Sequence, residues 1–354
     1  MTFRIKVLST TALLIALGAS AHAGPAPSVF ATGGAVGGTA PDSVSIGGGS
    51  VWIEYGNGAS STLPPGTDGS STIVQYSPTG AIQHTYSIAG SVDGMKYNPT
   101  TGMVWALQNQ DDNSTLSIIN PTTHTVSAPL SYGPPYVYGG GRGYDDVAFL
   151  GGKVFLSYTN PVNPTDPVLQ ILNNGNNPTG ILTTKDILAA AQEGVPAGPD
   201  TDSLKSTPSG QLVLTSGADG SFTLITNPGA AGQTETTIQV KSGGVNATSL
   251  DDVLFPTAAS GTLFFTNTGG NDVLKLQLTG LSLDTPIVAL GGSLNELAWV
   301  NLATGVATPL VTGLSSPHGL EFSAPEPSTW ALMLLGFAGL GFAGYRRTKT
   351  AVAA

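Results

Sequence analysis

Short strand-like runs of apolar and polar residues, separated by Gly, Pro, Ser and Asn, make up most of the chain. After "PDSVSI" at Pro41 come "SVWIEYG", "STIVQYSPTG" and "AIQHTYSIAG", and later runs such as "GMVWALQNQ" and "GKVFLSYTN" have the same character. Apolar residues that alternate with polar ones over four to eight positions are typical of β-strands, and the turn residues between them favour hairpins. The pattern therefore predicts an all-β fold.

A loose repeat organises these runs. Six segments share one plan, in which a polar residue, usually Asp, precedes alternating apolar and polar positions: "PDSVSI", "VDGMKY", "YDDVAF", "DTDSLK", "LDDVLF" and "PHGLEF". They recur at intervals of about fifty residues, which suits the four-stranded blades of a β-propeller. We expect six blades, with seven as the next possibility and a two-sheet sandwich as the alternative architecture.

The repeat makes two local predictions. Five large apolar residues should occupy equivalent inner strands of successive blades, namely Trp52, Trp105, Phe155, Leu212 and Phe264. The segment "TTKDILAAAQEGVPAGPD" departs from the strand pattern and predicts a short helix that begins at Thr183 or Thr184 and ends at Gly194.

Composition supports a folded, exported body. Hydrophobic residues form 40% of the 354 residues and recur between turns, enough for a sizeable core, whereas charged residues form only 10%. Cysteine is absent, which excludes disulfides and thiolate chemistry. Between Gly24 and Pro325, seven basic residues face twenty-one acidic ones, a formal net charge of −14. An acidic body without a basic stripe excludes nucleic acid as an expected partner.

The amino terminus predicts a signal peptide over residues 1–23. Arg4 and Lys6 precede an apolar stretch, and Ala21 and Ala23 form the small-x-small pattern of a signal peptidase site, which leaves Gly24 as the first mature residue. We therefore expect export, with residues 24–323 forming the extracytoplasmic body.

The carboxyl terminus, residues 324–354, has three elements in order. Pro325, Glu326 and Pro327 precede an apolar run, residues 330–345, and Arg346 and Arg347 follow it. The run predicts a single membrane-spanning helix with its arginines on the cytoplasmic side. This tail resembles the PEP-CTERM sorting signal of Gram-negative bacteria. The resemblance implies a processing partner, an exosortase-type membrane protease, and transfer to the cell surface or extracellular matrix.

The repeated acids are the first candidate site. Asp93, Asp146, Asp202 and Asp252, with Asp42, start their repeats, and His318 takes the sixth place. Rotational symmetry would place such residues on one face around the axis. Clustered carboxylates repel each other unless they are hydrated, protonated or neutralised, and hard oxygen ligands suit calcium. The alternative is that each Asp caps a turn by accepting a backbone N–H, which requires no ligand.

A second candidate is the loop "SYGPPYVYGGGRGYDD". Tyr136, Tyr138 and Arg142 could form a ligand face with His318, because aromatic rings stack on sugars; they could equally cover a propeller face. The chain has no phosphate-binding loop and no His-Glu-x-x-His motif. The turns "SPTG", "NPTT" and "NLATG" resemble those of NHL and related propellers. The expected function is a surface or matrix binding or scaffold protein, with extracellular polysaccharide as a possible partner; the alternative is a secreted hydrolase or lyase.

Overall fold

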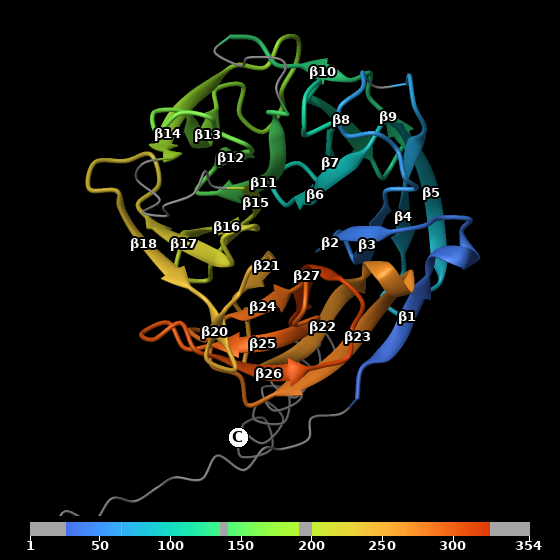
Figure 1. The fold of residues 1–354 in the computed structure, drawn as a ribbon. Coiled ribbons are helices and arrows are strands. Elements are labelled where there is room, and N and C mark those ends of the chain that lie inside the picture. The colour runs from blue at the N-terminus through green and yellow to red at the C-terminus, as the bar shows by residue number, and fades with distance from the viewer. Residues whose placement is uncertain (1–25, 65, 135–140, 191–199, 326–354) are drawn as a thin grey trace, which may run out of the picture.

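The computed structural model describes residues 26–64, 66–134, 141–190 and 200–325 (Figure 1). Six β-sheets surround a central axis as the blades of a propeller. Helical structure in these ranges is confined to short 3-10 turns such as η1 (Gly33–Ala35) and η3 (Thr268–Gly270). The predicted all-β fold with six blades is confirmed, and the seven-blade and sandwich alternatives are wrong.

The inner strands of the six blades form a closed ring around the axis. In blade order they are β2 (Pro41–Gly47), β6 (Val92–Asn98), β11 (Tyr144–Leu150), β15 (Thr201–Ser206), β21 (Leu250–Leu254) and β27 (Pro317–Ser323). Each inner strand contacts the next, and β27 contacts β2. Equivalent residues of these six strands therefore lie on circles around one axis.

Three further strands complete each blade from the axis outward, except that the second blade has two short outer strands. The second strands are β3 (Ser50–Tyr55), β7 (Met103–Gln108), β12 (Lys153–Tyr158), β16 (Leu212–Ser216), β24 (Ile287–Leu290) and β22 (Ser260–Asn267). The third strands are β4 (Ser70–Tyr76), β8 (Thr115–Asn120), β13 (Pro167–Leu172), β17 (Ser221–Thr226), β25 (Glu296–Val300) and β23 (Asp272–Thr279). The outer strands are β5 (Ile82–Ala89), β10 (Leu130–Ser131) beside β9 (Thr125–Val126), β14 (Thr184–Ala189), β18 (Thr234–Gln239), β26 (Ala307–Val311) and β1 (Ser28–Thr32). A separate hairpin joins β19 (Lys241–Ser242) to β20 (Val245–Asn246).

The last two blades exchange strands. After β21, the chain forms the hairpin β22–β23 in the sixth blade, returns for β24, β25 and β26 of the fifth, and ends with β27 in the sixth. The amino-terminal strand β1 pairs with β23 and closes the same blade from outside, as the blue strand beside the orange sheet in Figure 1 shows. Both ends of the described chain are thus tied into one sheet, which holds the ring shut.

The hydrophobic core lies between the blades. Six clusters of buried side chains fill the six interfaces between neighbouring blades. The second strands are buried along nearly their whole length because both of their faces pack against a neighbouring blade. This packing explains why runs such as "SVWIEY" lack strict alternation.

The five large apolar residues occupy equivalent strands, the second strand of a blade. Trp52 and Trp105 pair with the fifth residue of their inner strands, as do Phe155 and Phe264. Leu212 lies one residue out of this register. Phe264 belongs to the sixth blade rather than the fifth, because the strand exchange breaks the consecutive order of the repeats.

The predicted helix after Thr183 is wrong where the structure describes it. Thr184–Ala189 form strand β14, which pairs antiparallel with β13. Leu188 is buried at the interface with the fourth blade and Ile187 packs beside it. Backbone hydrogen bonds that close the blade edge outweigh the local helix propensity, and the β-branched residues Thr184 and Ile187 favour a strand.

Several predictions fall outside the described residues. These are the signal peptide over 1–23 with its cleavage residues Ala21, Ala23 and Gly24, and the tail from Glu326 onward, which includes Pro327, Arg346, Arg347 and the expected membrane helix. Within the described ranges, no helix is long and apolar enough to cross a membrane.

Candidate functional site

All six inner strands carry the same irregularity. In β2, Pro41 and Val44 keep their partners on β3, whereas Asp42 and Ser43 bulge out of the ladder. The irregularity recurs between the first and fourth residues of the other five inner strands. A bulge redirects side chains, and here it turns the second and third residues of each strand toward the axis. We call them the second-position and third-position residues.

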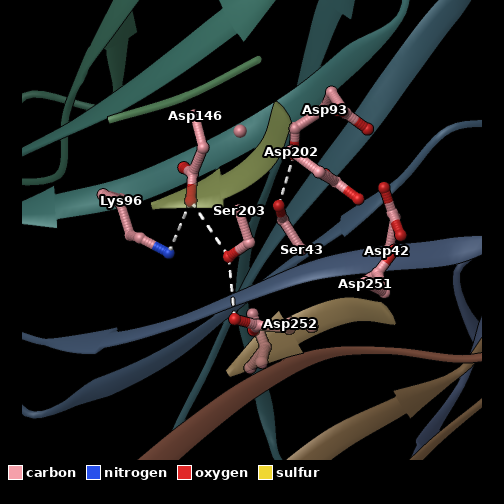
Figure 2. Close-up of a pocket in the computed structure, with 12 residues that line it drawn as sticks. Asp42, Ser43, Asp93, Lys96, Asp146, Asp202, Ser203, Asp251 and Asp252 are labelled. Carbon is pink, nitrogen blue, oxygen red and sulfur yellow. Dashed lines mark hydrogen bonds and ion pairs between the residues drawn. The ribbon is translucent and has the colours of Figure 1, made fainter. Parts of the chain in front are cut away.

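These two sets surround one small axial cavity. The second-position residues are Asp42, Asp93, Asp145, Asp202, Asp251 and His318. The third-position residues are Ser43, Gly94, Asp146, Ser203, Asp252 and Gly319. All except Asp145 and His318 line a cavity of about 30 Å³, shown in Figure 2. The repeat therefore brings acids from five blades to one place.

Two predicted members of the aspartate ring occupy the third position of their inner strands rather than the second. Asp146 and Asp252 are third-position residues, and the true equivalents of Asp93 and Asp202 are Asp145 and Asp251. Both errors arise in the "DD" pairs, where either Asp fits the repeat. The distance to the following apolar residue resolves the choice, because the second position always lies two residues before it.

Glycine at the third position allows neighbouring blades to approach closely. A Cβ on Gly94 would lie 2.2 Å from the backbone oxygen of Asp145, and one on Gly319 would lie 2.4 Å from that of Asp42. Neither position has space for a side chain. The glycines of "VDGMKY" and "PHGLEF" thus let the inner strands converge tightly enough for the second-position acids to meet.

The third-position acids are structural caps. Asp146 accepts the amide N–H of Val147 at 2.8 Å and that of Leu204, in the next blade, at 2.9 Å. Asp252 accepts the amide N–H of Val253 at 2.7 Å and that of Leu320, which lies in the next blade, at 2.5 Å. For these two residues the capping alternative describes the structure.

Two lysines neutralise these caps. Lys96 lies 3.2 Å from Asp146, and Lys205 pairs with Asp252 and donates to the carbonyl oxygen of Leu320. Lys205 lowers the pKa of Asp252 against the opposing effect of burial. We call Lys96, Lys205 and the two caps the lysine floor. Figure 2 shows Lys96, Asp146 and Asp252 on one side of the cavity, with Asp42, Asp93 and Asp202 on the other.

Three second-position acids form what we call the acidic trio: Asp93, Asp145 and Asp202. One carboxylate oxygen from each lies within 4.8 Å of the others. Burial, with the negative charge of neighbouring acids, raises the pKa of Asp93 and of Asp202 well above the usual range. Burial also raises the pKa of Asp145 to about 7. Among the described residues, no Lys, Arg or His forms an ion pair with the trio.

The remaining second-position residues form the histidine cluster of Asp42, Asp251 and His318. The imidazole Nδ1 of His318 lies 2.5 Å from Asp42 and 3.2 Å from Asp251, while Nε2 lies 2.9 Å from the hydroxyl of Ser316. Burial alone would lower the pKa of His318, but Asp251 and Asp42 raise it to about 10. His318 is therefore a cation at neutral pH and donates its Nδ1 proton to Asp42.

Side-chain hydroxyls lock neighbouring blades beneath the ring. Ser157, Thr215 and Thr266 stand at equivalent places on second strands and donate to the backbone oxygen of the second-position residue in the next blade, at 2.8–3.0 Å. Glu54 occupies this place in the first blade. It is fully buried, and burial followed by the charge of Asp42 raises its pKa well above the usual range, although hydrogen bonds from the Ser71 hydroxyl and the Ser43 backbone N–H oppose the rise.

The structure describes only part of the predicted aromatic ligand face. Tyr136 and Tyr138 fall outside the described residues. Nη1 of Arg142 lies 3.9 Å from a carboxylate oxygen of Asp166. Tyr132 and Tyr144, from the same loop, are buried against each other with ring centroids 4.2 Å apart. Both belong to the hydrophobic core between the second and third blades.

The tail is confirmed by comparison with protein families. The model of the PEP-CTERM protein-sorting motif matches residues 323–347. The chain carries a PEP-CTERM sorting motif. The match implies export, carboxyl-terminal anchoring and processing, as the resemblance predicted, and leaves the role of the body open.

Solved structures with a similar arrangement include three bacterial proteins. One of unknown function from Bacteroides caccae is 8% identical, with a TM-score of 0.48 over 79% of this chain and 85% of its own. A functionally unknown protein from Desulfotomaculum acetoxidans is 10% identical, with a TM-score of 0.47 over 82% of this chain and 90% of its own. A periplasmic gluconolactonase from Pseudomonas aeruginosa is 11% identical, with a TM-score of 0.45 over 80% of this chain and 88% of its own. At these levels no activity carries over to this chain. The search of curated proteins gave no match.

The chemistry of the two second-position clusters differs. Calcium takes six to eight oxygen ligands at about 2.3–2.6 Å, so two of its ligand atoms can lie up to about 5 Å apart. The acidic trio meets that condition and offers only oxygen. In the histidine cluster, both imidazole nitrogens are already hydrogen-bonded and the ring carries the balancing charge. The trio fits a hard cation, whereas the histidine cluster already holds a cation, the His318 imidazolium, beside its two carboxyls, and burial raises the pKa of Asp251 to about 8.

Proposed function

We propose that this is an exported protein, sorted to the cell surface or matrix by its PEP-CTERM tail, whose propeller binds calcium at the acidic trio and uses that centre to bind oxygen-rich extracellular polysaccharide. The main support is a contrast around one cavity, between acids that pair with a cationic side chain and acids that do not. The chain provides Lys96 and Lys205 for Asp146 and Asp252, and His318 for Asp42. It provides no such partner among the described residues for the trio.

Calcium would complete this charge balance. The raised pKa values of the trio carboxyls favour their protonated forms when no cation is present. A bound cation favours the ionised form, so binding releases protons and strengthens as the pH rises. The ion would keep coordination positions open toward the cavity, where hydroxyl or carboxylate oxygens of a polysaccharide could bind.

Calcium is expected to raise the melting temperature at pH 8 by about 5 °C at a hundredfold excess over its Kd, because it binds only the folded state. The double variant Asp145→Asn with Asp202→Asn should abolish this shift, since it removes two of three anionic ligands. Asp284→Asn, at an exposed loop acid, is the matched control and should keep it. An equal shift in the double variant, or none in the unchanged protein, would remove the trio from the proposal.

The sorting half of the proposal has its own test. In a host with an exosortase, the surface-displayed protein should lack the segment from Trp330 to Ala354, because cleavage of such tails is expected near Pro325–Glu326–Pro327. Intact-mass measurement of the surface fraction checks this, with Glu326→Ala as the variant whose tail should be retained. Finding the complete tail on the mature surface form of the unchanged protein would refute processing.

A second candidate function, a hydrolase or lyase, is favoured by one observation. His318 of the sixth blade and carboxylates from the other five blades converge around the axis. With a pKa of about 10, His318 would serve as a general acid rather than a base. Release of reducing or unsaturated ends from polygalacturonate, lost in His318→Asn while calcium binding persists, would favour this candidate over a binding protein.

A further inference from the structure

The inner strands enclose a second cavity below the lysine floor. It measures about 220 Å³ and is lined mainly by the fifth and sixth residues of these strands, three to four residues further along than the acidic ring. Among the residues that the structure describes, Lys96 alone lines both cavities, so the lysine floor separates them. The two cavities therefore lie at successive levels along the inner strands.

Aromatic side chains form the wall of this lower cavity. Tyr97, Phe149 and Phe255 line it. Tyr97 rests on Gly47, where a Cβ would lie 2.0 Å from the ring, and Phe149 packs edge-on to Trp105 with ring centroids 5.2 Å apart. Because their own packing holds these rings in place, they present prearranged apolar faces to a ligand.

Charged groups from alternate blades form the polar part. The fifth residues of the second, fourth and sixth inner strands are Lys96, Lys205 and Glu321, whereas the other three blades supply Ser45, Ala148 and Leu254. Each lysine is already balanced by its Asp in the floor. Glu321 has no ion pair among the described residues, and burial raises its pKa although both lysines oppose this. The carboxyl of Glu321 thus lines the same cavity as Lys96 and Lys205 without forming an ion pair with either of them.

We propose that this lower cavity is a second binding site, for a neutral sugar ring. Vicinal hydroxyls can each donate to Glu321 and accept from Lys96, while the ring's C–H face packs on the aromatic wall. Glu321 disfavours an anionic ligand, and the two lysines disfavour a cationic one. Pockets for drug-sized molecules span about 300–1,000 Å³, so a cavity of about 220 Å³ suits one ring. The site uses no residue of the acidic trio and needs no calcium.

Saturation-transfer NMR with the methyl glycosides of glucose, galactose and mannose tests the proposal on the purified protein. At least one should bind in the millimolar range, equally with calcium or with a chelator. Glu321→Gln should weaken binding about tenfold, the equivalent of one hydrogen bond to a charged group. Phe149→Leu should weaken it by removing an aromatic face while keeping a large apolar side chain. Asp284→Asn is the control.

The outcomes separate this site from the axial ring. Binding that persists in Asp145→Asn with Asp202→Asn but falls in both lower-cavity variants supports the proposal, even if the calcium site fails. Binding that requires calcium, or that is unchanged in both Glu321→Gln and Phe149→Leu, overturns it. Preference for glucuronate over the neutral glycosides overturns the assignment of a neutral ligand, and no transfer to any of the three glycosides overturns the site. If Glu321→Gln unfolds, Phe149→Leu alone decides.

Discussion

Replacing Lys205 with methionine is expected to lower the free energy of unfolding by about 3–5 kcal/mol, because it leaves the buried carboxylate of Asp252 without a cation. Lys205 is 7% exposed and Asp252 is 2% exposed, so water cannot take over the role of the ammonium group. The carbonyl oxygen of Leu320 would also lose its donor. Urea denaturation at pH 7 measures the loss.

A matched substitution and a double variant sharpen this test. Lys153→Met, at the exposed start of β12, removes the same charge and should change stability by no more than about 0.5 kcal/mol. Lys205→Met combined with Asp252→Asn should recover part of the loss, since no buried charge remains while one amide acceptor survives. If Lys205→Met costs no more than Lys153→Met, the lysine floor does not stabilise the channel.

Glu54→Gln is expected to make the protein more stable at alkaline pH. The pKa of Glu54 in the folded protein is raised above its unfolded value. Its contribution to the free energy of unfolding is therefore fully present below about pH 4.5 and is lost as the pH rises toward the folded pKa. The loss amounts to about 1.4 kcal/mol for each pH unit within that window. Glutamine has the same shape and never ionises, so it removes this loss.

Unfolding measured from pH 4 to pH 9 checks the effect. The difference between Glu54→Gln and the unchanged protein should grow with pH above about 4.5, whereas Asp284→Asn should show no such trend. The comparison isolates Glu54, because the trio, whose raised pKa values act in the same direction, is present in both proteins. A difference that does not vary with pH would mean that Glu54 is ionised and satisfied in the folded state.

The repeated Asp segments were enough to predict six blades and one axial ring. Rotational symmetry converts equal sequence positions into equal places around the axis, and the inner strands obey it. The exchange of β22–β23 into the sixth blade could not be predicted, because each hairpin fits either neighbouring interface by its local pattern. Likewise Thr184–Ala189 pair as a strand because a blade edge was free, which the local sequence does not reveal.

The candidate site was predicted at the level of the ring but not of its individual acids. "DD" at Asp145–Asp146 and Asp251–Asp252 carries two roles in adjacent residues, a ring member and a cap. The lysine floor was missed although a signal existed: Lys96 and Lys205 both lie three residues after the second-position Asp of their repeats. Glu54, the single charge in "SVWIEY", was also visible, but its burial depends on the blade packed against it.

The location of a bound cation tests the central claim most directly. Crystals of the protein grown with calcium at pH 8 should show one anomalous peak on the axis, about 2.3–2.6 Å from carboxylate oxygens of Asp93, Asp145 and Asp202. The peak should be missing from crystals of the Asp145→Asn, Asp202→Asn variant. An empty trio under these conditions, or a peak located instead among Asp42, Asp251 and His318, would contradict the account.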